Sequence, residues 1–328
     1  MAVASLAGCQ QIRMQQATEL TVRGIDLLED QEYEAAVAEF QEAIALNPQL
    51  AIAHSRMGAA YLAMGRIHQA LECYQHAVKV DPFSFEDAFC LGQIHHRLGQ
   101  VREAIRAYLH AADLNENSFQ CQLSLGVCHL QLGAVDQAVE RFQAALAIDP
   151  DSAFAYSNLG AAYDMQGHYY EAIGAYKESL ERDPRQPMVL VNLGTTYIKQ
   201  QRFNAAEGAF ARAVECDPTC AAAYERLGYC LYRQAKLDEA EHTYKKALDQ
   251  SEKLASAHAG LGVVLMTRYL QVQKAAETPG DSDETADLRQ RGLEHWHRSL
   301  ELDPDQPKIR RLLEKYSPKL AAKSLPTL

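Results

Sequence analysis

Four polar side chains recur at one spacing and could together bind a peptide backbone. Ser124, Asn158, Asn192 and Arg226 follow one another at intervals of 34 residues. A carboxamide carries both a hydrogen-bond donor and an acceptor, so Asn158 and Asn192 could each pair with a peptide bond whatever its side chain. The alternative is a solvated polar face that binds no ligand.

Residue types suited to catalysis or metal binding are present without the patterns that those chemistries need. The 12 histidines accompany no glycine-rich phosphate loop, zinc-protease helix or nucleophile elbow, so we expect no enzyme activity and no cofactor. Cys216 and Cys220 lack the two further ligands of a zinc site, so we expect no metal. Cys128 and Cys230, each two residues after a recurrent glycine, are predicted to be small buried side chains.

The helices that must position these residues follow from a strict repeat of 34 residues. When its glycine is numbered position 8, position 20 is alanine seven times, position 24 is always aromatic, and position 27 is alanine or serine. These spacings place small side chains on the facing sides of two helices, with an aromatic ring filling the space between them. The repeat glycines are Gly24, Gly58, Gly92, Gly126, Gly160, Gly194, Gly228 and Gly262.

This pattern resembles the tetratricopeptide repeat over roughly residues 17–304. The resemblance implies an all-α, right-handed superhelical solenoid of antiparallel helix pairs, in which the first helix of each pair lines an inner groove. Family members mostly bind peptides or protein segments there. The resemblance also places Asn158 and Asn192 on the groove, where asparagines of family members hold the backbone of an extended peptide.

The groove implied for the fifth to seventh repeats is mildly basic, because only Asp164 and Glu225 oppose its cations. In a chain of net charge −11, such a patch favours an acidic segment or a C-terminal carboxylate as partner, and the net charge disfavours nucleic acid. The predicted peptide-binding residues are Ser124, Asn158, Asn192, Lys199, Arg226, Tyr229 and Arg233.

The first two repeats carry apolar residues at groove positions, among them Val22 and Ile52. Three explanations are open: an apolar partner segment, a second copy of the chain, or coverage by residues 1–16. We favour coverage by residues 1–16.

The repeats are predicted to span 17–50, 51–84, 85–118, 119–152, 153–186, 187–220, 221–254 and 255–304. The last contains an insertion of 18 residues between its helices, with an acidic segment at 277–284 that lacks the ligand spacing of a calcium loop. Residues 305–328 are predicted to form a capping helix, with Ile309, Leu312 and Leu313 on one face, followed by a short basic tail.

Residues 1–16 contain the sequence Leu-Ala-Gly-Cys, ending at Cys9 and followed by two glutamines. It resembles the lipobox of bacterial lipoproteins, which implies a lipid anchor on Cys9 and a place in the bacterial envelope. It departs from that pattern because it has no basic segment and its apolar stretch is short. The alternative is the ordinary start of a capping helix in a cytoplasmic protein.

The predicted function is a non-enzymatic scaffold that binds a peptide or protein segment in its groove. Two alternatives remain open: a lipid-anchored assembly factor of the bacterial envelope, and a module that assembles with copies of itself.

Overall fold

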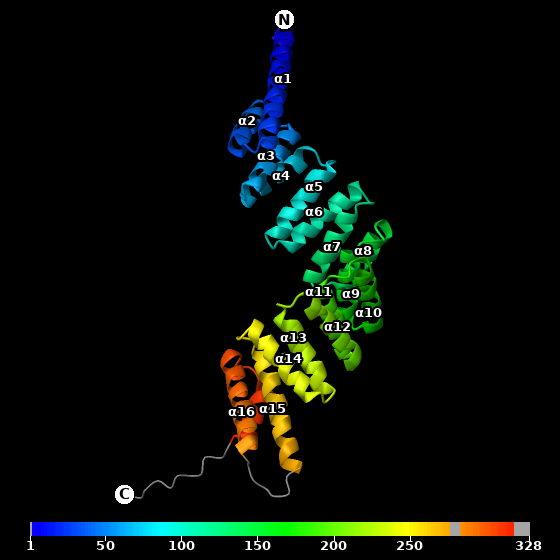
Figure 1. The fold of residues 1–328 in the computed structure, drawn as a ribbon. Coiled ribbons are helices and arrows are strands. Elements are labelled where there is room, and N and C mark those ends of the chain that lie inside the picture. The colour runs from blue at the N-terminus through cyan, green and yellow to red at the C-terminus, as the bar shows by residue number, and fades with distance from the viewer. Residues whose placement is uncertain (1, 276–282, 318–328) are drawn as a thin grey trace, which may run out of the picture. The chain divides into compact units, whose positions relative to one another are not determined.

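The computed structural model describes the backbone of residues 2–275 and 283–317 and, except at residues 2–9 and 284, their side chains. The regular structure within these ranges is helical (Figure 1). The chain forms two compact units, an N-terminal half, Met1–Gln166, and a C-terminal half, Gly167–Leu328. The predicted all-α fold is confirmed.

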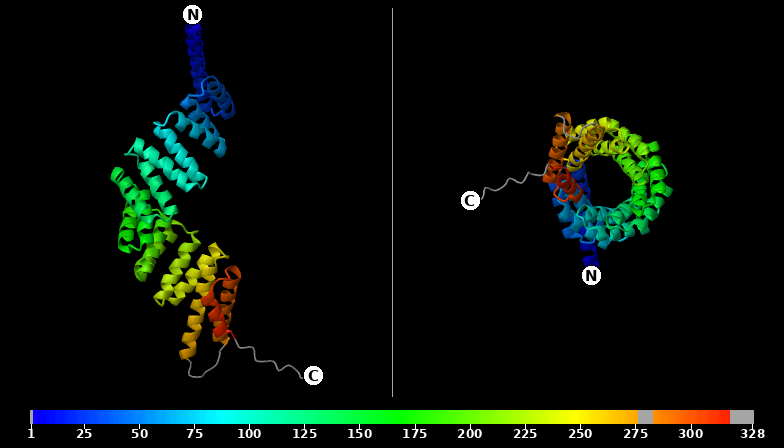
Figure 2. Two further views of the ribbon diagram at one scale, coloured as in Figure 1. Left: turned by 180° about the vertical axis from the view of Figure 1, so that it is seen from behind. Right: turned by 90° about the horizontal axis from the view of Figure 1, so that it is seen from below.

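Each half is a row of helices that pack in chain order (Figure 2). The N-terminal half contains α1 (Ala2–Glu29), α2 (Tyr33–Leu46), α3 (Ala51–Ala63), α4 (Ile67–Val80), α5 (Phe85–Arg97), α6 (Val101–Leu114), α7 (Phe119–Gln131), α8 (Val135–Ile148) and α9 (Ala153–Gln166). The C-terminal half contains α10 (Tyr169–Arg182), α11 (Pro187–Lys199), α12 (Phe203–Cys216), α13 (Ala221–Arg233), α14 (Leu237–Gln250), α15 (Ala255–Ala275), α16 (Asp283–Leu302) and α17 (Pro307–Tyr316).

The repeat glycines allow the two helices of a pair to touch through the aromatic ring at position 24. A Cβ atom on Gly126 would lie 2.5 Å from Cε1 of Phe142, and one on Gly194 would lie 2.7 Å from Cζ of Phe210. Both rings are fully buried. A glycine inside a helix costs about 1 kcal/mol relative to alanine, so it is retained where close packing returns more.

The small residues at positions 20 and 27 complete this contact. Each described alanine at position 20 and each alanine or serine at position 27 has no exposed surface. Replacing any of them by a longer side chain would separate the helices, as would a side chain on the repeat glycine. The sequence pattern therefore specifies the core of every helix pair.

A second row of residues, at position 15 of the repeat, makes the turn between the two helices. Gly65, Gly99 and Gly133 all adopt the left-handed conformation there, with φ of 72° or 73°. Gln201 and Ala235 hold the same conformation in the C-terminal half, with φ of 59° and 62°. Non-glycine residues adopt this conformation only at a free-energy cost, so these turns carry local strain.

Where position 27 is serine, a glutamine from the following loop binds the end of the second helix. The Nε2 group of Gln186 donates to the hydroxyl oxygen of Ser179 at 3.0 Å and to the Asp183 carbonyl at 2.9 Å. Gln306 likewise donates to the carbonyls of Ser299 and Asp303, at 3.1 and 2.9 Å. The glutamine satisfies carbonyl oxygens that a helix terminus leaves without partners.

The last repeat is closed by α17. Its Ile309 and Leu313 are buried against Trp296 of α16 and Met266 of α15. The helix begins with proline at its first position and covers apolar surface that an open end of the row would expose to water. The acidic segment predicted at 277–284 falls mainly outside the described residues.

The prediction that residues 1–16 cover the apolar groove of the first repeats is wrong. Residues 2–16 belong to α1, a single helix of 28 residues whose N-terminal part extends past α2 and α3 (Figure 1). Residues 10–16 are exposed, as are Val22 and Ile52. The stretch is rich in glutamine, a good helix former, and contains no proline that would end the helix and let the chain fold back.

Candidate protein-binding face

The first helices of successive repeats contact one another directly within each half. In the C-terminal half α11 contacts α13 and α13 contacts α15, and in the N-terminal half α1 contacts α3 and α7 contacts α9. No contact of comparable extent joins successive second helices in the described ranges. The first helices are therefore the more closely spaced layer, and they line the inner side of each half.

The inner side of the C-terminal half carries a positioned arginine. The Arg233 guanidinium lies 4.2 Å from the ring centre of Phe203 and 5.7 Å from that of Tyr229. Its Nη1 group donates a hydrogen bond of 2.8 Å to the Tyr229 hydroxyl oxygen. These contacts hold the guanidinium in place and leave it exposed, with donors still directed to solvent.

A second arginine, Arg226, lies about two helical turns before Arg233 on the same helix, α13. Arg226 pairs with Glu225 at 3.3 Å, and the Glu225 side chain is largely buried. Burial raises the pKa of Glu225, and the nearby Arg226 only partly opposes that rise. The Arg226 side chain itself stays about half exposed, so part of its guanidinium remains accessible to a ligand.

Two more predicted residues lie on the neighbouring helix α11. The exposed Lys199 places its ammonium group 5.5 Å from the ring centre of Tyr169. Asn192 is exposed at position 6 of the same helix. Five of the predicted residues therefore belong to two helices, α11 and α13, that contact each other. We call the surface they form the basic inner face; it consists of Asn192, Lys199, Arg226, Tyr229 and Arg233.

The other two predicted residues lie in the N-terminal half, and their side chains also contact groups of the chain itself. The Nδ2 group of Asn158 donates to the Phe154 carbonyl of its own helix at 2.8 Å. Ser124 is half-buried and hydrogen bonded to the Tyr108 side chain. Cys90 occupies the equivalent position and makes the same kind of bond to Tyr74. Position 6 thus contacts the tyrosine of the preceding repeat, a packing role that the sequence pattern had not indicated.

The inner side of the N-terminal half contains a pocket of 460 Å³ between α3 and α5 that is mainly acidic. Asp81, Glu86 and Asp87 line it together with Arg56. Asp87 is buried and accepts a hydrogen bond of 2.5 Å from the Ser55 hydroxyl. Of its charged residues only Arg56 and Glu86 occupy groove positions of the repeat, whereas Asp81 and Asp87 do not, so the periodic pattern did not indicate this pocket.

Exposed apolar side chains at groove positions form another feature that sequence reasoning missed. Phe154 and Met165 of α9 are 59% and 57% exposed, and Met188 of α11 is 65% exposed. Phe154 and Met188 both occupy position 2 of the repeat, so the signal was present in the periodic alignment. Apolar surface of this kind is typical of sites that bind protein segments.

Two cysteines at position 10 of the repeat are buried in packing roles. Cys128 and Cys230 have no exposed surface, as predicted. No group of three histidine, cysteine or acidic side chains suited to a metal ion occurs in the described part of the chain.

A buried histidine pair joins the two helices of the last repeat. Nε2 of His258 donates to the Glu252 carbonyl at 3.0 Å, so its Nδ1 must accept the 2.9 Å hydrogen bond from Nδ1 of His295. Burial, together with the nearby His258, lowers the pKa of His295 to about 4. The His295 ring is therefore neutral near pH 7.

The lipid anchor predicted at Cys9 stays a prediction. Its backbone lies within α1, and its side chain is outside the described set. None of the described helices combines the length and apolar character needed to span a bilayer.

Comparisons with known proteins agree with the repeat architecture. The profile of the cilia and flagella-associated protein 70 C-terminal domain matches residues 90–261, which is more than half of the chain. A TPR repeat profile matches residues 26–65 and a tetratricopeptide repeat profile matches residues 51–84. These matches cover repeats in both halves.

Solved structures show the same fold at low sequence identity. YrrB, described as a TPR protein with an unusual peptide-binding site, is 20% identical, with a TM-score of 0.51 over 64% of this chain and 99% of YrrB. The Cut9–Hcn1 structure matches 87% of this chain and 53% of its own at 16% identity, with a TM-score of 0.56. MamA matches 52% of this chain and 93% of its own at 23% identity, with a TM-score of 0.50. With its helix pairs, its packed glycine and aromatic positions and the profile match over residues 90–261, the chain belongs to the tetratricopeptide-repeat family of the cilia and flagella-associated protein 70 C-terminal domain.

Proposed function

We propose that this chain is a non-enzymatic scaffold that binds an acidic protein segment on the basic inner face of its C-terminal half. Tetratricopeptide repeats are generally protein-interaction modules, which supports the general role. The observation that carries the specific proposal is Arg233, an exposed guanidinium held by Phe203 and Tyr229. A cation that is already ordered loses little conformational entropy when it binds a carboxylate.

The residues around Arg233 could bind other parts of the same acidic segment. Arg226 provides a second cation, because its side chain is about half exposed although it pairs with Glu225. Asn192 on the adjacent helix offers a carboxamide that can bind the backbone of the segment. The exposed Met188 offers an apolar contact on the same helix. The preferred ligand is an extended segment with two carboxylates and an apolar residue.

The test is fluorescence anisotropy of the full chain with a labelled peptide of glutamates separated by serines, plus one leucine. We expect saturable binding that weakens as salt rises, because exposed charge pairs are screened. Replacement of Arg233 by alanine should weaken binding about tenfold, since a hydrogen bond to a charged group contributes about 1.5–3 kcal/mol.

The substitution Arg233→Lys separates geometry from charge. Lysine keeps the positive charge but loses the planar donors and much of the stacking, so we expect intermediate affinity. A peptide with glutamine in place of every glutamate is the matched ligand control. Equal affinity of the two peptides, or unchanged affinity of the Arg233→Ala variant, would show that the basic inner face is not the acidic-segment site.

A further inference from the structure

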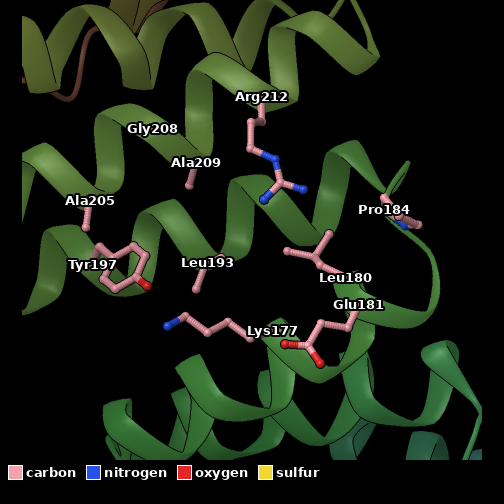
Figure 3. A pocket seen from close by; sticks show the side chains of 10 residues that line it. All are labelled: Lys177, Leu180, Glu181, Pro184, Leu193, Tyr197, Ala205, Gly208, Ala209 and Arg212. Carbon is pink, nitrogen blue, oxygen red and sulfur yellow. The ribbon is translucent and has the colours of Figure 1, made fainter.

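A groove lies between α10 and α12, in the layer that the second helices of the repeats form in the C-terminal half. Figure 3 shows its lining, with α11 beneath it. The groove has a volume of 620 Å³. Its floor is apolar, because Leu180, Leu193, Tyr197 and Ala209 are nearly buried and contribute mainly carbon. It is separate in position and in chemistry from the basic inner face.

The groove is open on the α12 side because α12 lacks the long side chains that α6 and α14 carry. At positions 19, 22 and 23 of the repeat, α12 has Ala205, Gly208 and Ala209. The corresponding residues are Glu103, Arg106 and Ala107 on α6, and Glu239, His242 and Thr243 on α14. Long side chains at positions 19 and 22 would occupy the space that is open on α12.

Gly208 differs in kind from the glycines of the repeat. A Cβ atom on Gly208 would meet no atom within 4 Å, whereas one on Gly194 would collide with Phe210. Packing therefore does not explain glycine at this exposed position in the middle of a helix. A glycine there costs about 1 kcal/mol relative to alanine, and its visible effect is to open the groove.

The rim of the groove is charged. Arg212 extends from α12 over the apolar floor toward Leu180, and Glu181 lies at the opposite edge (Figure 3). Lys177 stands on α10 one turn before Glu181. Within the described residues neither Lys177 nor Arg212 takes part in an ion pair. Because the Arg212 guanidinium lies over the apolar floor, Arg212 is the cation best placed to bind a ligand.

We propose that this groove binds an amphipathic helix of a partner protein that presents one bulky apolar side chain and a carboxylate one turn away. The apolar side chain enters over Leu180, Tyr197 and Ala209, and the carboxylate pairs with Arg212. Two parallel walls and an apolar floor suit a helix, whose side chains four residues apart lie on one face. The proposal does not depend on the basic inner face.

The experiment measures anisotropy of a labelled alanine-based helical peptide carrying leucine and, four residues later, glutamate. The full-length chain should bind it about fivefold more tightly than a peptide with glutamine in place of glutamate, because only glutamate forms a charge-assisted bond. The Arg212→Gln variant should bind the two peptides equally.

Two substitutions of Gly208 separate a filled groove from a damaged fold. Gly208→Met fills the groove from an exposed helical position and should abolish binding, while Gly208→Ala adds one methyl group and should retain it. Circular dichroism melting should show both variants folded. Loss of binding by Gly208→Met but not by Arg233→Ala would assign the peptide to this groove.

Three results would overturn the proposal. The first is no saturable binding of the glutamate peptide, and the second is unchanged affinity in the Gly208→Met variant. The third is a dimer in sedimentation velocity that the Gly208→Met variant loses, because the occupant would then be a second copy of the chain.

Discussion

In the N-terminal half, the inner side near α3 and α5 gathers Asp81, Glu86 and Asp87 around a single arginine, Arg56. In the C-terminal half, α13 presents Arg226 and Arg233 with one largely buried glutamate. Arg56 and Arg226 occupy the same position of the repeat, yet one stands among carboxylates and the other beside a stacked arginine. The shared positions 8, 20, 24 and 27 build the same core in both halves, while the groove positions are free to differ in charge.

This difference shows how a repeat can hold its fold constant and vary its surface. Within each half, a helix pair buries its own aromatic ring against its own glycine, so stability is built locally. The exposed groove residues contribute little to that core and can change without disturbing it. A test of the comparison must therefore show that core changes act alike in the two halves and that surface changes do not.

The largest expected effect is on the shared core. Gly126→Val in the N-terminal half and Gly194→Val in the C-terminal half should each lower the free energy of unfolding by about 3 kcal/mol or more, because the new side chain overlaps a buried ring. Urea denaturation of each variant provides the measurement. Gly208→Ala, with no neighbour to meet, is the control and should be neutral or stabilising.

A rescue sharpens this prediction. Adding Phe142→Leu to Gly126→Val removes part of the ring that the new side chain strikes, so the double variant should lose less stability than the sum of the two single changes. If the stability losses of the two single variants were strictly additive in the double variant, Gly126 and the Phe142 ring would not be in direct contact.

The next effect distinguishes the buried histidines of the two halves. His295 binds its proton less readily when folded, with a pKa lowered to about 4 from 6.5, so folding stability falls as the pH drops from about 6.5 toward 4. We expect a loss of about 1–2 kcal/mol between pH 7 and pH 5. Thermal melting across this range should show it.

The control for this prediction is to replace His295 and His54 by glutamine, one at a time, and to compare the pH dependence of stability. His295→Gln should flatten the pH dependence in this range. His54 in the N-terminal half also has a pKa lowered by burial, although its bond to the Pro48 carbonyl opposes the change. His54→Gln should therefore remove a smaller part of the dependence, and an equal effect of both substitutions would contradict the assignment to His295.

The charge difference between the inner sides gives a smaller effect. Arg226→Ala should weaken binding of the acidic peptide about fivefold, which corresponds to about 1 kcal/mol. Arg56→Ala, at the same repeat position, should leave that affinity unchanged because the carboxylates around Arg56 repel an acidic ligand. Anisotropy titrations at one salt concentration compare the two. Equal losses would mean that the two faces do not differ in the way their charges indicate.

The smallest effect concerns the turns. Ala235 holds the left-handed conformation that Gly133 holds in the N-terminal half, so Ala235→Gly should stabilise the chain by about 0.5–1 kcal/mol. Gly133→Ala should destabilise it by a similar amount. Chemical denaturation of both variants measures the pair, and a destabilised Ala235→Gly variant would argue against strain at this turn.

Much of the fold could be predicted because each repeat is specified by residues close together in the chain. The spacing of Gly126, Ala138 and Phe142 indicates two facing helices, and the structure places that ring against that glycine. The turn glycines at Gly65, Gly99 and Gly133 recur with the same period, so the sequence alone indicates them. The wrong prediction that residues 1–16 fold back over the groove came from α1, where no proline or turn marks a stop.

The candidate site was less accessible to sequence reasoning, for a physical reason. Position 6 was interpreted as a ladder of ligand-binding groups, but Ser124 bonds to Tyr108 and Asn158 bonds to its own helix. Such choices depend on which neighbouring atom lies within hydrogen-bond distance, and a periodic pattern carries no such information. The stacking of Arg233 between Phe203 and Tyr229 likewise depends on which side chains lie close in space.

The sequence by itself determined the helix pairs, their buried contacts and the predominance of basic residues at groove positions of the later repeats. Those properties depend on side-chain size, helical period and charge, all of which are written in the order of residues. Only the tertiary structure decided that Glu225 is buried beside Arg226 and that Gly208 opens a groove between α10 and α12. Burial and open space arise where separate helices meet, so they depend on distances that no single helix contains.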